Sequence, residues 1–104
     1  MLVIDPVNEF TKQPAESYTR AIDFTGKLPT GATLQSGTVQ AIDLSGADVS
    51  GTVLSGTSAV ISGNEARIKV LAGVHGQDYR IRFVMTLTNT DVLEEDMLMH
   101  VLNR

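Results

Sequence analysis

The sequence predicts an all-β protein, an immunoglobulin-like sandwich of about seven short antiparallel strands preceded by an extended N-terminal arm. Three observations support this fold class. Apolar and polar residues alternate at period two in several segments, and turn-forming residues recur roughly every eight to twelve residues. No long segment keeps the i, i+3, i+4 apolar spacing of a helix. A small β-barrel is the alternative architecture.

Length and composition allow one small domain. The chain has 104 residues, of which 42% are hydrophobic and 5% aromatic, which is enough for one modest core. We assign residues 17–104 to the sandwich domain. We assign residues 1–16 to the arm, because Pro6 and Pro14 interrupt a stretch without sustained alternation. The arm is expected to be ordered only where Phe10 or Leu2 meets a groove.

Charge and composition disfavour several classes of partner. Eight Lys and Arg against twelve Asp and Glu leave a net charge of −4, so nucleic acid is not an expected partner. No apolar run reaches the ~20 residues that span a bilayer, and the first residues lack the pattern of a signal peptide, so no membrane partner is expected. The lack of cysteine excludes disulfides and thiolate chemistry.

The clearest strands form a hairpin near the C-terminus. Alternation runs from residue 79 to residue 87, turn-forming residues occupy 88–91, and alternation resumes from 92 to 101. If Val92 pairs with Thr88, the inward side chains of both strands share one surface. Glu95 then lies opposite Met85, at an open rim or on a bulge. The inward set is Tyr79, Ile81, Phe83, Met85, Leu87, Leu93, Met97, Met99 and Val101.

Other strands are shorter. Residues 58–62 and 65–71 flank Gly63-Asn64, which predicts a second hairpin with a two-residue turn. Strands are expected over 17–24 and 32–42, separated by a turn at 28–31, with Gly37 marking a bulge. Residues 44–63 are rich in Gly, Ser and Thr, and we expect one or two short strands there around Val53 and Val60.

Tyr79 stands at the start of the long strand, just after the Gly-rich connection 73–76. This is where a tyrosine corner lies in immunoglobulin-like domains, with the hydroxyl bonded to backbone a few residues upstream. The alternative is a tyrosine that covers the core and leaves its hydroxyl in water.

A search for chemical machinery finds no catalytic site. His75 and His100 are isolated and lack metal-ligand spacing. Consecutive strand residues point to opposite faces, so the carboxylates of residues 94–96 do not converge on one bond. No serine lies in a G-x-S-x-G motif. Four loop carboxylates also lack calcium-loop spacing: Asp43, Asp48, Asp78 and Asp91. We therefore expect no enzyme activity, no cofactor and no metal.

Four residues are candidates for contact with a partner protein. Val84 and Leu98 project from the hairpin face opposite the core, with Leu102 further along the same side. Phe10 and Lys12 belong to the arm, and arms of this kind often contact partners.

An ordered set of short motifs covers residues 10–102. The first half reads Phe10-Thr-Lys12-Gln13-Pro14-Ala-Glu16, Tyr18, Ile22-Asp23-Phe24 and Leu28-Pro29-x-Gly31-x-Thr33-Leu34. The second half reads Ala72-Gly73-x-x-Gly76-x-x-Tyr79, Leu93-Glu94-x-Asp96 and a closing strand that ends at Val101. In this order the motifs resemble small structural proteins of tailed bacteriophages and prophages. The chain departs from the pattern at Asn89-Thr90-Asp91, where a Gly-containing turn is more usual.

The resemblance implies a non-enzymatic, immunoglobulin-like virion protein that acts as an adaptor or spacer in the head-tail or tail-fibre region. Its implied partners are other phage structural proteins, and its implied location is the virion after synthesis in the bacterial cytoplasm. A carbohydrate- or surface-binding module at a tail tip is the alternative function. Exposed sheet edges would suit partner binding by strand addition.

Overall fold

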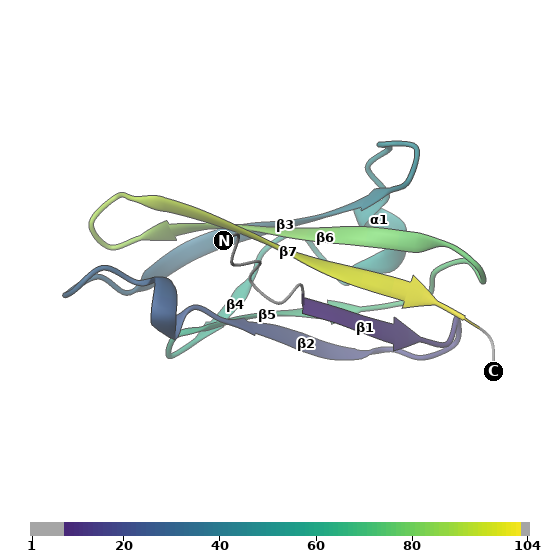
Figure 1. The fold of residues 1–104 in the computed structure, drawn as a ribbon, viewed down its shortest axis with the longest axis horizontal. Helices are drawn as coiled ribbons and strands as arrows, with labels where there is room; N and C mark the ends of the chain where they lie inside the picture. Colours follow the sequence, from purple (N-terminus) through teal and green to yellow (C-terminus); the bar gives the residue numbers. More distant parts are fainter. Residues whose placement is uncertain (1–7, 103–104) are drawn as a thin grey trace, which may run out of the picture.

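The computed structural model describes residues 8–102 and forms a sandwich of two β-sheets (Figure 1). One sheet has four strands in the order β1-β7-β6-β3, and the other has three in the order β2-β5-β4. Two short helical turns, η1 (Thr25–Lys27) and α1 (Ser50–Val53), complete the described elements. The strands are β1 (Asn8–Lys12), β2 (Tyr18–Asp23), β3 (Leu34–Asp43), β4 (Val60–Ser62), β5 (Glu65–Val70), β6 (Asp78–Leu87) and β7 (Val92–Val101). The predicted all-β sandwich is confirmed. Neither described helix has the length and apolar character needed to cross a membrane.

The first strand differs from the prediction in two ways. Residues 8–12 were assigned to the arm, but they form β1 and pair with β7 in parallel, with Phe10 opposite Met99. All other strand pairs are antiparallel, as predicted. The sequence did not predict this strand because β1 has only five residues, which is too short to show alternation. Residues 1–7, including Leu2, lie outside the described part of the chain.

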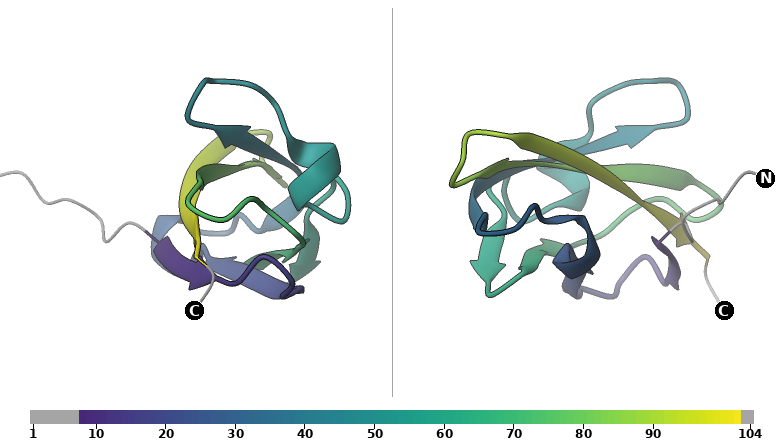
Figure 2. Two further views of the ribbon diagram at one scale, coloured as in Figure 1. Left: turned by 90° about the vertical axis from the view of Figure 1, so that its right-hand side faces the viewer. Right: turned by 60° about the vertical axis from the view of Figure 1, so that its left-hand side comes forward.

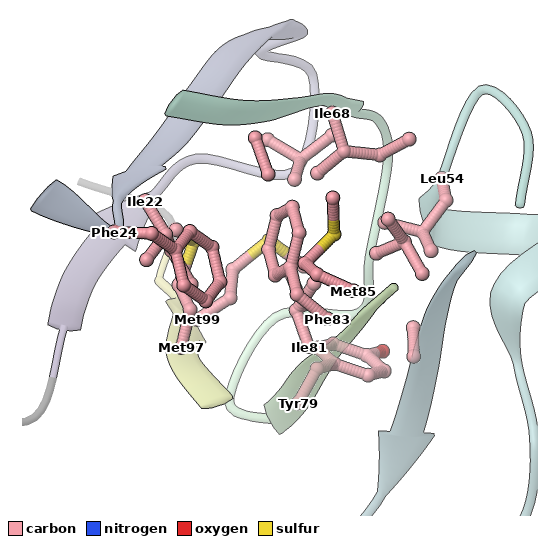
Figure 3. Close-up of a cluster of buried hydrophobic side chains, with 14 of the residues drawn as sticks. Ile22, Phe24, Leu54, Ile68, Tyr79, Ile81, Phe83, Met85, Met97 and Met99 are labelled. Carbon is pink, nitrogen blue, oxygen red and sulfur yellow. The ribbon is translucent and has the colours of Figure 1, made fainter. Parts of the chain in front are cut away.

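The core fills the space between the sheets. Figure 3 shows side chains of β6 and β7 facing those of β2 and β5, with methionine sulfurs packed among aromatic and branched groups. The inward residues of the predicted hairpin all pack in this core, and all but Leu93 are buried. Packing this dense needs each strand to keep its side-chain alternation toward one face.

The hairpin register is displaced by two residues from the predicted one. Leu93 lies opposite Met85, where the prediction paired it with Leu87. The turn lies one residue earlier in the chain than predicted. The Leu87 N–H donates to the Asp91 carbonyl at 2.8 Å, so residues 88–90 connect the strands in place of residues 89–91. A shift by an even number keeps every side chain on its predicted face. Glu95 lies opposite Phe83 instead of Met85, within an unbroken ladder, and forms an ion pair with Lys27 of η1.

Two local predictions in the middle of the chain are wrong. The bulge in β3 lies between Leu34 and Ser36. Gly37 instead leaves room for the buried Met85 side chain, because a Cβ at this position would overlap it. Val53 belongs to the helical turn α1, because Asp48 Oδ1 accepts hydrogen bonds from both N–H and Oγ of Ser50 and starts a turn. The predictions of a strand around Val60 and a two-residue turn at 63–64 are confirmed.

The segment between β3 and β4 covers the outer edge of β3. The N–H of Val39 donates to Thr57 O at 2.8 Å, and the N–H of Val49 donates to Ala41 O at 2.8 Å. Figure 2 shows the 43–49 loop projecting beyond the four-stranded sheet, beside α1. Residues of this loop line a hollow together with residues of β6.

Candidate interaction surfaces

Tyr79 forms the predicted tyrosine corner. Its hydroxyl accepts a hydrogen bond from the Val74 N–H at 3.0 Å, five residues upstream, and the residue is 5% exposed. The same connection is tied to the last strand, because the Gly76 N–H donates to Val101 O at 2.7 Å and the Val101 N–H donates to Gln77 O at 3.0 Å. These bonds hold the 73–77 connection against the end of the sandwich.

Two of the four predicted contact residues are turned inward. Phe10 is 9% exposed and Lys12 is 1% exposed. Lys12 Nζ donates hydrogen bonds to the carbonyls of Gln13 and Glu16, each at 2.8 Å. Burial lowers the pKa of this amine, against the opposing effect of the Glu16 carboxylate. Neither side chain offers surface to a partner in this structure, which corrects the expectation for Phe10 and Lys12.

Val84 and Leu98 lie on the outer face of the four-stranded sheet, as predicted, and both are half-buried. They do not form one apolar patch, because the Arg82–Asp96 pair lies between their positions on β6 and β7. Arg82 Nε is 3.3 Å from Asp96 Oδ1 and 3.0 Å from a Glu94 carboxylate oxygen. The face is therefore a charged sheet surface with two separate apolar positions.

Leu98 borders a hollow of about 310 Å³ that sequence analysis did not find. Ile42 and Leu44 supply further apolar lining, and Arg80 and Asp78 supply charge. Leu44 is 77% exposed, the highest value among the large hydrophobic residues of the described chain. The sequence feature that could have indicated this surface is Leu44 itself, because an apolar side chain in a Gly- and Ser-rich loop has no core to fill.

The loop that carries Leu44 is held by one carboxylate. Asp43 Oδ1 accepts hydrogen bonds from the Ser45 hydroxyl at 2.6 Å, the Ser45 N–H at 2.9 Å and the Ala47 N–H at 3.0 Å. The Ser45 hydroxyl is the main cause of a lowered pKa at Asp43, and the Ala47 N–H adds to it. Leu44 is therefore presented on an ordered turn.

His100 connects three strands on the same outer face. Its Nδ1 is 2.7 Å from Asp78 Oδ1 on β6, and its Nε2 is 2.7 Å from Glu9 Oε2 on β1. The hydrogen bond with Asp78, followed by that with Glu9, raises the pKa of the ring. The sequence showed His100 only as an isolated histidine, and the structure gives it two carboxylate partners.

Two other loop carboxylates, Asp48 and Asp91, take part in local turns. Across residues 8–102, no three His, Asp or Glu side chains gather in a way that could hold a metal ion. Asp48 is used to start the turn at Ser50, and Asp91 accepts a hydrogen bond from Asn89 Nδ2 at 3.0 Å.

The described residues form a small β-sandwich of a four-stranded and a three-stranded sheet, an architecture that hosts many functions. Residues 12–100 match the family described as podophage GP4 fiber-tail adaptor protein gp77, and the chain belongs to this family. The match confirms the resemblance to tailed-phage structural proteins of the adaptor type. A search of curated proteins gives no match.

Proposed function

We propose that the protein is a non-enzymatic virion component that joins the tail of a phage or prophage particle to its fibres through protein–protein contacts. The observation that carries this proposal is the family match over residues 12–100 to a fiber-tail adaptor. Its partners are other phage structural proteins, and neither nucleic acid nor membrane is among them.

The architecture supports a mechanical role. The two sheets enclose one continuous core, and the Tyr79 corner and the His100 contacts tie its elements together. A rigid body of this kind transmits force between partners without losing the geometry of its surfaces.

The aromatic residues favour protein contacts over the carbohydrate-binding alternative. All five aromatic side chains of the sequence lie in the described region and are buried or half-buried. Carbohydrate modules commonly stack sugar rings on exposed aromatic rings, and the structure presents no such ring. The glycan function therefore gains no support from these residues.

We assign one partner contact to the outer face around Leu98. Its apolar centre consists of Leu98, Ile42 and Leu44 beside the hollow, with Val84 two rows away along the sheet. Interfaces gain most of their binding energy from a few apolar or aromatic anchors within a polar surround. Leu44, exposed on an ordered loop, is the proposed anchor.

Deletion of the gene followed by complementation tests this function. Particles made without the protein should have tails but few fibres by electron microscopy, and the wild-type gene should restore them. Complementation with Leu44→Asp should fail, because a carboxylate cannot be buried cheaply in an apolar contact. Val60→Asp is the matched control, since Val60 is 63% exposed on the other sheet. Normal fibres on deletion particles would contradict the proposal.

A further inference from the structure

Arg20 of β2 has no carboxylate partner in the described part of the chain. Its guanidinium lies over the Phe10 ring, 4.5 Å from the centroid, and its Nε is buried without a hydrogen-bond partner. The other arginines of residues 8–102 each have a carboxylate nearby: Arg67, Arg80 and Arg82. An unpaired donor in a partly buried cation is costly, and an acceptor on a partner would remove that cost.

Arg20 also lies on an open sheet edge. β2 is the outer strand of the three-stranded sheet. The Phe24 N–H donates to Asn64 O, so the alternating pattern of antiparallel pairing directs the backbone groups of Thr19 and Ala21 away from β5. No backbone group within residues 8–102 bonds to these outward groups. They are available to another strand.

The other sheet edges are less suitable. The edge of β3 is covered by the chain's own 43–59 segment, and β4 has only three residues. On β1, the Thr11 carbonyl is approached by the Tyr18 hydroxyl at 3.4 Å. Among the described strands, β2 therefore combines outward backbone groups that lack a backbone partner with an unsatisfied charge.

We propose that β2 binds an extended segment of another virion protein, and that an Asp or Glu of this segment pairs with Arg20. This inference rests on the proposed adaptor function and adds the chemistry of a second partner, which an adaptor needs. The segment would continue the three-stranded sheet by backbone hydrogen bonds to Thr19 and Ala21. A new strand there would cover the side of the sandwich where Arg20 meets Phe10.

Strand geometry fixes the pattern of the segment. Side chains alternate between faces, and neighbouring strands place side chains of the same face opposite each other. Arg20 has the same parity as the inward, 2% exposed Ile22. The carboxylate must therefore be on an inward position, with apolar residues on the inward positions before and after it. The expected sequence is apolar-x-acidic-x-apolar.

An inward charge on an edge strand has a second possible use, because such charges protect sheets against unwanted strand addition. The two roles give opposite results when Arg20 is replaced by a neutral residue. A protective charge, once removed, would let the protein self-associate and would leave peptide preference unchanged. A recognition charge, once removed, would abolish the preference for an acidic segment.

Titration of the full-length ¹⁵N-labelled protein with two synthetic peptides separates these roles. One peptide is acetyl-Thr-Val-Thr-Glu-Thr-Val-Thr-amide, and the matched peptide has Gln in place of Glu. The Glu peptide should shift the Arg20 Nε–H signal and the Thr19 and Ala21 amides, with affinity about tenfold or more above that of the Gln peptide. Arg20→Gln should abolish the difference. Arg67→Gln, at an exposed arginine already paired with Glu65, should preserve it.

Three results would overturn the inference: equal affinity for the two peptides, no shift at millimolar concentration, or self-association of Arg20→Gln with unchanged peptide preference. Particle assembly distinguishes this failure from failure of the proposed function. If fibres attach normally to Arg20→Gln particles but are missing from deletion particles, the Arg20 contact is ruled out and the adaptor function stands. If fibres attach normally to particles that lack the protein, the adaptor function itself is ruled out.

Discussion

His100 Nε2 lies 2.7 Å from Glu9 Oε2, and this contact ties the parallel edge strand β1 to β7. Asp78 on β6 holds the other ring nitrogen at the same distance. The two hydrogen bonds raise the pKa of His100 above its ordinary value of 6.5, so the charged ring favours the folded state. The stabilisation should be complete below about pH 6.5 and should be lost as pH rises through the folded-state pKa.

Urea unfolding of the wild type and His100→Gln between about pH 5.5 and pH 9 measures this effect. The difference in free energy of unfolding should shrink as pH rises through that window. NMR titration of the ring gives the folded pKa directly. A value at or below 6.5, or a difference independent of pH, would contradict the assignment.

Tyr79→Phe should reduce the free energy of unfolding by about 1 kcal/mol, because the Val74 N–H loses its acceptor at the corner. Tyr18→Phe is the matched control. The Tyr18 hydroxyl reaches Thr11 O only at 3.4 Å, so its loss should cost a smaller amount. Equal losses in urea unfolding would argue against a specific role for the corner.

Thr90→Gly should stabilise the protein by about 1 kcal/mol. Thr90 has a φ of 73°, a conformation that is strained for a β-branched residue and relaxed for glycine. Thr88→Gly in the same loop should destabilise, since Thr88 Oγ1 accepts a hydrogen bond from the Thr33 N–H at 3.1 Å. Thermal unfolding of both variants checks the pair, and a loss of stability in Thr90→Gly would refute the strain argument.

Gly37→Ala should destabilise the protein by about 1–3 kcal/mol through overpacking. The added Cβ would overlap the side chain of Met85, which is fully buried and has little room to move. Gly51→Ala provides the control, because no atom lies within 4 Å of the added methyl and the site is helical. That variant should be neutral or slightly more stable. Unchanged unfolding of Gly37→Ala would show that Met85 repacks freely.

Alternation predicted the parts of the fold that depend on burial. The inward faces of β6 and β7 are as expected even though the register is displaced, because a two-residue shift leaves each side chain on its face. The alternation marked Glu95 as the exception on this face but did not give its partner, because Lys27 comes from the helical turn η1, which the alternation did not predict.

Contacts that depend on tertiary structure were not predictable in this way. Lys12 is a polar residue in a proline-containing segment, and its burial depends on the carbonyls of Gln13 and Glu16 folding around the amine. The missing carboxylate partner of Arg20 and the edge position of β2 became clear only from the arrangement of the strands. In the sequence, Leu44 is only one residue of a Gly- and Ser-rich loop. The turn held by Asp43 places it at the same hollow as Leu98.

Mass spectrometry of purified phage particles tests the adaptor function most directly. Particles purified through successive density gradients should contain peptides of this chain in fixed proportion to the tail and fibre proteins. A comparison with particles stripped of their fibres should show whether the chain stays with the tail or leaves with the fibres. Absence of the chain from intact, infectious particles would contradict a virion role.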